Sequence, residues 1–247
     1  MVTGMDAEPV TPRPLREAGR VLFRQTWSQL TFLHWAVPPE RVAAYLPPGV
    51  RPDVIDGVSY VGLVPFLMRR ISIAGGPAVP YLGSFHETNV RLYSVDRQGR
   101  RGVVFVSLDA SRLAPVLAAR WGPGLPYFWS SMADDRIGDE ITYTCRRRWP
   151  GPRGASSSIS IRIGDPMDAG PLELFLTARW GLHGAHRGRS YYWPNSHEPW
   201  PLHSAVAGQF GDELLAAAGF GDLAGRPPES VLFSPGVHVI FGPRLPA

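Results

Sequence analysis

The chain has 247 residues, of which 44% are hydrophobic and 19% charged, and its formal net charge is +4. This composition is typical of a globular protein and excludes an intrinsically disordered chain. The 25 cationic side chains are all arginine, because the sequence contains no lysine. A lysine Schiff base, a lysine general base and a P-loop lysine are therefore excluded.

The cysteine content and the N-terminal segment indicate the cellular compartment in which we expect the protein. Cys145 is the only cysteine, so the chain cannot form an intrachain disulfide and a cysteine-based metal site is disfavoured. Residues 1–19 mix acidic residues with prolines and lack the apolar core of a secretory signal. No apolar run approaches the ~20 residues that a membrane-spanning helix needs. We expect a cytoplasmic protein with a flexible N-terminal arm (1–19), a single domain (20–247) and no membrane association.

Short apolar or alternating segments, separated by Gly- and Pro-rich turn signals, continue through the whole chain. They predict many antiparallel strands and a few short helices, which is a β-rich α+β fold. Two strands are predicted within residues 21–37. The other predicted strands are 58–68, 84–93, 102–110, 125–132, 137–147, 156–163, 191–193, 201–207 and 231–241, and the predicted helices are 40–46, 111–120, 172–180 and 212–218.

The segment 84–93 carries the strongest indication of a functional site. Its alternation assigns five residues to one strand face: Phe85, Glu87, Asn89, Arg91 and Tyr93. An acid, an amide, a guanidinium and a phenol in a row cost free energy to bury unless they pair with each other or with a ligand. The following run, 102–108, is almost wholly apolar, as in a buried neighbouring strand, and this favours a polar face that lines a cavity.

The direction and pairing of this face remain open at the level of sequence. Glu87 and Arg91 lie about 13 Å apart along a strand, at ~3.3 Å per residue, and so cannot pair with each other. Each either forms a buried ion pair, for instance with Arg120, Arg179 or an aspartate, or binds a ligand. A one-residue change of register would turn the whole face the other way.

The residues disfavour two other kinds of site, a metal site and a nucleic-acid surface. A metal site built from His183, His186, His197 and Glu198 is conceivable. A polar, Gly-rich loop that happens to contain histidines explains the same residues better, and we expect no metal and no cofactor. The arginines are scattered and not gathered on one segment, so we expect no nucleic-acid partner.

Several short strings together resemble a known family. They span roughly residues 20 to 241 and lie in a characteristic order. The chain resembles the bacterial family typified by YqjF, within the acetoacetate decarboxylase-like superfamily. The strings are Leu33-His34-Trp35, Asp56-Gly57-x-x-Tyr60-Val-Gly-Leu63-x-Pro65-Phe66, Glu87-Thr-Asn89-Val-Arg91-x-Tyr93, Ala119-Arg120, Leu125-Pro126-Tyr127, Phe175-Leu-x-x-Arg179 and His197-x-x-Trp200-Pro-Leu202.

The resemblance implies a cone-shaped antiparallel barrel or sheet with a central cavity. Acetoacetate decarboxylases form a Schiff base on a lysine in that cavity, and this chain has no lysine. That mechanism therefore cannot be carried over. The resemblance also implies that the acidic residue of the superfamily corresponds to Glu87 and its substrate-side region to residues 120–127.

These observations predict a cavity enzyme that uses acid–base chemistry on a small carbonyl- or carboxylate-bearing molecule. A lyase, isomerase, hydratase or cyclase would suit the residues, and a step in bacterial secondary metabolism would suit the composition. The alternative is a non-catalytic small-molecule-binding protein that uses the same cavity. Association into a homo-oligomer is left open. The predicted catalytic residues are Glu87, His34 and His197, and the predicted substrate-binding residues are Asn89, Arg91, Tyr93, Arg120, Tyr127, Arg179 and Trp200.

Overall fold

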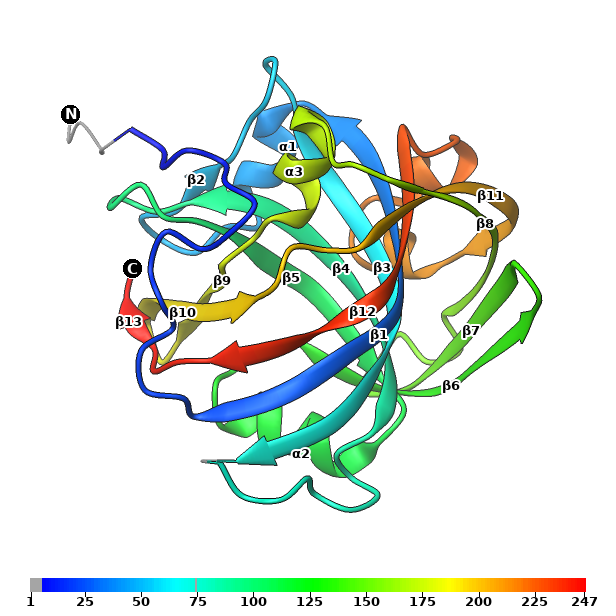
Figure 1. The fold of residues 1–247 in the computed structure, drawn as a ribbon, viewed down its shortest axis with the longest axis horizontal. Helices are drawn as coiled ribbons and strands as arrows, with labels where there is room; N and C mark the ends of the chain where they lie inside the picture. Colours follow the sequence, from blue (N-terminus) through cyan, green and yellow to red (C-terminus); the bar gives the residue numbers. More distant parts are fainter. Residues whose placement is uncertain (1–5, 74) are drawn as a thin grey trace.

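The computed structural model describes residues 6–73 and 75–247, and within them the strands join one 13-stranded sheet (Figure 1). The strands are β1 (Phe23–Val37), β2 (Arg51–Pro52), β3 (Ser59–Ile73), β4 (Phe85–Val95), β5 (Arg101–Ala110), β6 (Tyr127–Ile137), β7 (Glu140–Trp149), β8 (Ser156–Met167), β9 (Gly181–His186), β10 (Arg189–His197), β11 (Leu202–Asp212), β12 (Ser230–Phe241) and β13 (Leu245–Pro246). The helices are α1 (Pro39–Ala43), α2 (Leu113–Trp121), α3 (Pro171–Thr177), α4 (Leu214–Ala217) and a 3₁₀ turn, η1 (Gly221–Gly225). The predicted β-rich α+β class is confirmed.

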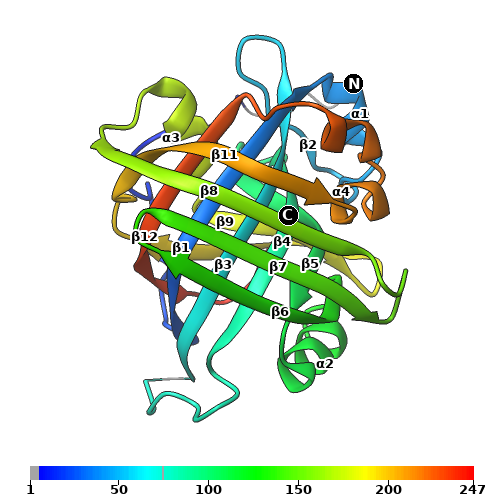
Figure 2. The same cartoon turned by 90° about the vertical axis from the view of Figure 1, so that its right-hand side faces the viewer.

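The strand pairings close two rings that share the strands β12, β1, β3, β4 and β5. The first ring is completed by β9 and β10, and the second by β6, β7, β8 and β11. Figure 2 shows β6, β7, β8 and β11, the strands that belong to the second ring alone, side by side across one face of the molecule, in front of β1 and β3. The sheet therefore forms two strand rings with a shared wall and not a simple barrel.

The shared strand β4 is buried on both of its faces, which is why its sequence is unusual. Val90 and Leu92 pack into the dry core enclosed by the second ring. Glu87, Asn89 and Arg91 point the other way and line a cavity enclosed by the first ring. A strand between two buried layers has no solvent face, so its polar residues must be satisfied inside the protein or by a ligand.

An irregularity in β1 explains why the sequence predicted two strands where there is one. The pairing of β1 with β3 shifts between Ser28 and Leu33, and Gln29 has a positive φ of 51°. Such a bulge changes which alternate residues face inward. Gln25 and Trp27, before it, line the cavity, whereas odd-numbered Leu33 beyond it faces the opposite core.

Two pairings depart from the antiparallel arrangement of the rest of the sheet. β5 runs parallel to β6 and to β9. The helix α2 forms the crossover between β5 and β6, as a parallel connection requires. The strand β9 was not predicted, because residues 181–186 (GLHGAH) contain two glycines and two histidines and lack a strand-like apolar alternation. Predicted helix 172–180 ends earlier, at Thr177.

The predicted N-terminal arm is described from residue 6, and its first five residues lie outside the described part of the chain. Residues 6–19 form no helix or strand. Their backbone contacts the β4–β5 turn, where the Glu8 N–H donates to the Gly99 carbonyl at 2.9 Å. In the described residues, no helix combines the length and apolar character needed to cross a membrane.

Candidate functional site

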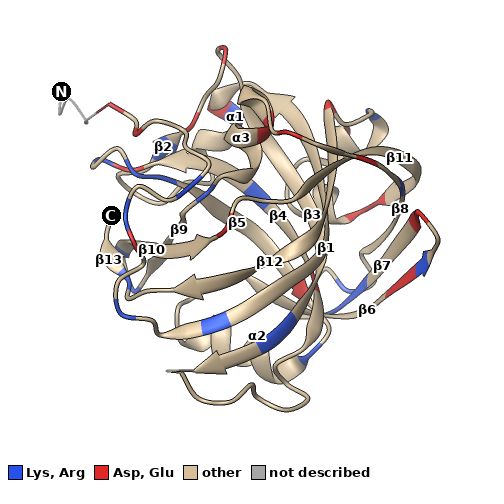
Figure 3. Ribbon diagram, in the orientation of Figure 1, with Lys and Arg blue, Asp and Glu red and all other residues tan. Residues whose placement is uncertain are grey.

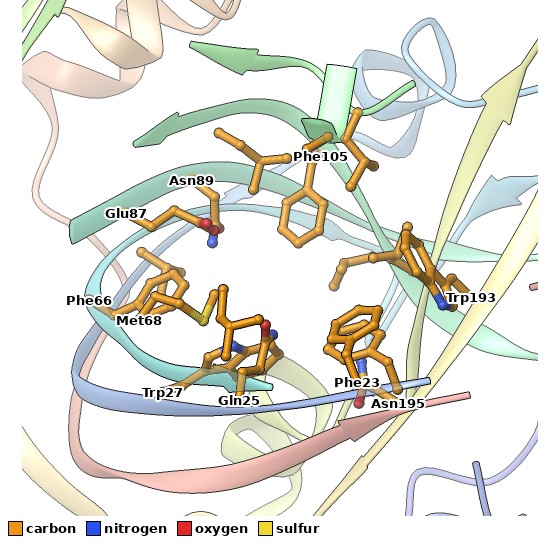
Figure 4. A pocket seen from close by; sticks show the side chains of 18 of the residues that line it. Phe23, Gln25, Trp27, Phe66, Met68, Glu87, Asn89, Phe105, Trp193 and Asn195 are labelled. Carbon is orange, nitrogen blue, oxygen red and sulfur yellow. The ribbon is translucent and has the colours of Figure 1, made fainter. Parts of the chain in front are cut away.

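The first ring of strands encloses a cavity of about 630 Å³. Its wall is mostly aliphatic and aromatic, with a few polar side chains, which is the usual character of a small-molecule site. Figure 4 shows Glu87 and Asn89 pointing into this space from one wall, opposite Gln25 and Trp27. The polar or ionisable residues that line it are Gln25, Trp27, Glu87, Asn89, Arg91, Tyr127, Thr177, Arg179, Trp193, Asn195, His197 and Trp200.

The structure brings most of the predicted site residues together. Seven line the cavity: Glu87, Asn89, Arg91, Tyr127, Arg179, His197 and Trp200. His34, Tyr93 and Arg120 do not line it. Tyr93 contacts Arg91, Arg120 contacts Tyr127, and His34 contacts Tyr93.

Glu87 is buried, with 3% of its surface exposed, and has no cationic partner among the described residues. The Tyr127 hydroxyl donates a hydrogen bond to Glu87 Oε2 at 2.7 Å. Burial raises the pKa of Glu87 to about 7, and the hydrogen bonds from Tyr127 and Asn89 only partly offset this effect. Glu87 can therefore gain or lose a proton at neutral pH.

Arg91 enters the cavity without a carboxylate partner among the described residues. Its Nη2 donates to the Leu176 carbonyl at 3.0 Å, and its Nε donates to the Tyr93 hydroxyl at 3.3 Å. The guanidinium carbon lies 5.2 Å from the ring centre of Phe32. These neutral contacts orient the guanidinium but leave its charge uncompensated, so the ion pair considered from the sequence is not formed.

Tyr93 and His34 form the support behind Arg91. The Tyr93 hydroxyl donates to the Leu176 carbonyl at 2.8 Å, and it lies 2.6 Å from His34 Nε2. Because the Tyr93 hydroxyl proton is donated to the Leu176 carbonyl, the Tyr93 oxygen must accept the hydrogen bond from His34. Nε2 of His34 therefore carries the imidazole proton. Burial, together with Arg91 and Arg179, lowers the pKa of His34 well below its ordinary value. His34 is therefore a neutral support.

A glycine makes room for this support. A Cβ at Gly62, in β3, would lie 3.1 Å from Arg91 Cγ and 3.2 Å from His34 Cδ2. Gly62 is the direct partner of Arg91 in the β3–β4 pairing. The absence of a side chain at Gly62 lets the arginine stem cross the neighbouring strand.

Arg179 also lines the cavity but carries a counter-ion. Its Nη1 pairs with Asp53 Oδ2, and its guanidinium donates to the Phe175 carbonyl. Asp53 is 2% exposed and pairs with Arg101 as well. One carboxylate thus serves two arginines, so this end of the cavity keeps an excess of positive charge.

His197 and Trp200 belong to an aromatic wall. The His197 ring centre lies 4.6 Å from that of Trp180 and 4.8 Å from that of Trp200. Burial lowers the pKa of His197 to about 4, so the ring is neutral at pH 7. His197 Nδ1 donates to the Glu198 carbonyl at 2.7 Å, which leaves the lone pair on Nε2.

Arg120 supports Tyr127 from outside the cavity. Its Nη1 donates to the Tyr127 carbonyl at 2.6 Å, and its guanidinium carbon lies 5.3 Å from the ring centre of Trp149. Arg120 was predicted to bind substrate, and in the structure it does not line the cavity. Its contact holds the first residue of β6, from which Tyr127 reaches Glu87.

Sequence reasoning missed Gln25, Trp27 and Asn195. Asn195 Oδ1, Trp27 Nε1 and Asn89 Oδ1 are buried and have no hydrogen-bond partner among the described residues. Buried polar atoms of this kind are uncommon and here line a cavity, as expected of ligand-binding groups. A signal was present, since the Trp193-x-Asn195-x-His197 alternation continues the strand that the sequence prediction ended at residue 193.

The histidines considered as a metal site lie in separate environments. Nδ1 of His183 lies 2.8 Å from the Ser94 hydroxyl, whereas His197 contacts the Glu198 carbonyl. Residues 6–73 and 75–247 contain no group of three or more His, Cys, Asp or Glu side chains that could hold a metal ion.

Comparisons with known proteins agree with this architecture. Residues 24–238 match DUF2071, a family described as an uncharacterized conserved protein. The protein YqjF of Bacillus subtilis (strain 168) is 33% identical over 189 residues, covering 75% of this chain and 77% of YqjF.

Similar solved structures share the fold at low identity. An acetoacetate decarboxylase-like enzyme from Sphingomonas wittichii RW1 has a TM-score of 0.63 and 13% identity, covering 99% of this chain and all of its own (100%). The acetoacetate decarboxylase of Legionella pneumophila has a TM-score of 0.60 and 13% identity, with coverages of 94% and 90%. The enduracididine biosynthesis enzyme MppR, complexed with pyruvate, has a TM-score of 0.60 and 14% identity, with coverages of 91% and 90%. The fold is that of the acetoacetate decarboxylase-like enzymes, and the chain belongs to the DUF2071 family.

Proposed function

We propose that the cavity binds a small organic acid that bears a carbonyl group and transforms it by general acid–base catalysis. The observation that carries this proposal is the presence, in one cavity, of a buried carboxyl group with a pKa of about 7 and a buried guanidinium without a counter-ion. The first can move a proton at neutral pH, and the second can hold an anion.

Glu87 is the proton carrier in this proposal. A base with a pKa near the working pH combines a useful population of the ionised form with useful basicity. Tyr127 holds the carboxyl group in one orientation through its 2.7 Å hydrogen bond. The neutral imidazole of His197 offers an acceptor, whereas His34, behind Arg91, takes no direct part.

Arg91 holds the carboxylate of the substrate or the negative charge that develops on its carbonyl oxygen. A charge-assisted pair in a water-poor cavity is strong and directional. Arg179 adds to the positive potential, although Asp53 occupies part of its guanidinium. Asn89 lies between Glu87 and Arg91 along β4 and has a free carbonyl oxygen for a hydroxyl or amide of the substrate.

The structural neighbours support this substrate class. MppR has been solved with pyruvate and with the condensation product of pyruvate and imidazole 4-carboxaldehyde. A shared fold alone does not transfer that chemistry, and this chain has no lysine for an iminium mechanism. Proton transfer next to a carbonyl needs no lysine, and it is common to lyases, isomerases, hydratases and cyclases. Binding without turnover is the alternative.

The test is hydrogen–deuterium exchange at carbon, which detects proton abstraction before the full reaction is known. The purified protein would be incubated in D₂O with a panel of 2-oxo and 3-oxo acids, and NMR would follow loss of the signals next to the carbonyl. We expect accelerated exchange or conversion for at least one acid, and a loss of 10²-fold or more in Glu87→Gln.

A matched control is Glu140→Gln, which alters an exposed carboxylate paired with Arg162 and should keep the full rate. Undiminished exchange in folded Glu87→Gln would remove Glu87 from the mechanism and overturn the proposal. Acids that raise the melting temperature through Arg91 but undergo no exchange would favour the binding protein instead.

A further inference from the structure

The chemistry of the cavity changes steadily along the β3–β4 pair. The polar residues of β4 gather toward one end, and the outer positions of both strands are apolar. From the inner end outward, the paired residues are Arg91 with Gly62, Asn89 with Val64, Glu87 with Phe66, and Phe85 with Met68.

The apolar end is the open one. Ile73, at the end of β3, lines the cavity and is 65% exposed, whereas Arg91 is 9% exposed. Phe23 pairs with Ile73 across β1 and β3 and is partly exposed. Figure 1 places the start of β1, the end of β3 and α2 together in the lower part of the view, with α3 at the upper end. The β3–β4 wall of the mouth is therefore apolar, and the inner end is cationic; Asn195, level with Phe23, is a polar residue on the opposite wall.

The volume of the cavity exceeds what a small oxo acid fills. A four-carbon oxo acid has seven non-hydrogen atoms; even if each took the roughly 30 Å³ of a whole water molecule, the acid would occupy at most about 200 Å³. The cavity measures about 630 Å³, a size typical of sites for drug-sized ligands. If the acid group sits at Arg91, the remaining volume lies toward Phe66, Met68 and Phe23, where burial of an apolar body gains free energy.

Positive charge also flanks the mouth on the outside. Arg24, Arg69 and Arg70 are exposed on the strands that form it, and none of them has an ion-pair partner in the described part of the chain. Figure 3 shows blue and no red on these stretches of β1 and β3. Such a potential raises the association rate of anions.

We infer that the ligand is an elongated amphipathic acid that binds head first. Its anionic group pairs with Arg91 at the inner end, and an alkyl or aryl body of roughly eight or more carbons runs past Glu87 to the mouth, whose rim carries Phe23 and Ile73. The inference rests on the proposed function for the reaction next to Glu87. The identity of the ligand class follows from the charge, the volume and the gradient.

A series of acids and alcohols of increasing chain length tests the inference. Straight-chain carboxylates of 4, 6, 8 and 10 carbons, and the primary alcohols of the same lengths, would be titrated by calorimetry at concentrations where none forms micelles. We expect each methylene to tighten binding of the acid by about threefold to fourfold until the mouth is reached. Each acid should bind at least tenfold more tightly than its alcohol.

Two variants separate the head from the tail. Arg91→Gln should weaken the acids at least tenfold and leave the alcohols unchanged, whereas Arg162→Gln, on an exposed ion pair, should change neither. Ile73→Asp places a charge at the exposed mouth, where the fold tolerates it. It should weaken the ten-carbon acid at least fivefold and leave butanoate unchanged.

Each failure has its own signature. Affinity that does not change between 4 and 10 carbons, or acids no tighter than alcohols, overturns the inference and leaves acid–base chemistry on a smaller substrate intact. If the affinity for acids increases with chain length but carbon–hydrogen exchange in Glu87→Gln is undiminished, the ligand class stands and the proposed reaction is overturned.

Discussion

The Tyr127 hydroxyl donates to Glu87 Oε2 at 2.7 Å, from the first residue of β6 to a residue near the start of β4. These strands are not neighbours in the sheet, since β5 lies between them. The contact exists because α2 returns the chain to the end of β5, where Tyr127 pairs with Leu108. A carboxyl group and a phenol 40 residues apart are thus held in one cavity wall.

The first prediction concerns stability and pH. The pKa of Glu87 rises from 4.5 to about 7 on folding, so the folded protein binds the extra proton between these values. Protonation of Glu87 contributes fully to the free energy of unfolding below pH 4.5. This contribution is lost as the pH rises to 7, a change of about 3 kcal/mol. Urea unfolding from pH 4 to 8 should show Glu87→Gln gaining stability relative to wild type over this interval. A difference that does not vary with pH would contradict the shift.

The second prediction concerns Tyr127→Phe. The hydroxyl stabilises the ionised form of Glu87, so its removal should raise the pKa of Glu87 further. Carbon-13 NMR of labelled glutamate would follow the titration directly. Tyr81→Phe, whose exposed hydroxyl contacts Arg112, is the control and should leave the titration of Glu87 unchanged. A lower pKa of Glu87 in Tyr127→Phe would show that the hydroxyl has another role.

The third prediction concerns Gly62→Ala. The added Cβ would crowd both Arg91 and His34 at 3.1–3.2 Å, so the guanidinium must move. Carboxylate affinity should fall tenfold or more, with a stability loss of about 1–2 kcal/mol. Gly211→Ala, where a Cβ would meet nothing within 4 Å, should change neither quantity. Calorimetry and urea unfolding check both, and unchanged affinity would show that Gly62 does not set the position of the Arg91 guanidinium.

The fourth prediction concerns Asp53→Asn. This change leaves Arg179 and Arg101 without their shared carboxylate, and Arg179 is 4% exposed. Removing one partner of a buried ion pair costs about 3–5 kcal/mol. Breaking the exposed Glu140–Arg162 pair with Glu140→Gln should have little effect on stability, because water and salt screen an exposed pair. Equal effects in urea unfolding would mean that Asp53 is not a structural counter-ion.

Much of this protein could be predicted from the sequence. The missing lysine excludes an iminium mechanism whatever the fold. The alternation of residues 85–93 placed Glu87, Asn89 and Arg91 on one face, because side chains of a strand alternate strictly. The order of short strings indicated the family and, through it, the fold.

Tertiary structure decided the rest. Whether the Glu87 face points to a cavity or into ion pairs depends on which layer β4 faces, and that is set by ring closure between strands far apart in the chain. The bulge at Gln29 determines which residues of β1 reach the cavity, and no periodic pattern reveals a bulge. Asn195 and Tyr127 join the site through pairings of β10 and β6, and His34 is withdrawn from it because Arg91 and Tyr93 lie in between. Sequence alone fixes which chemical groups the chain has, whereas long-range strand pairing fixes which of them meet.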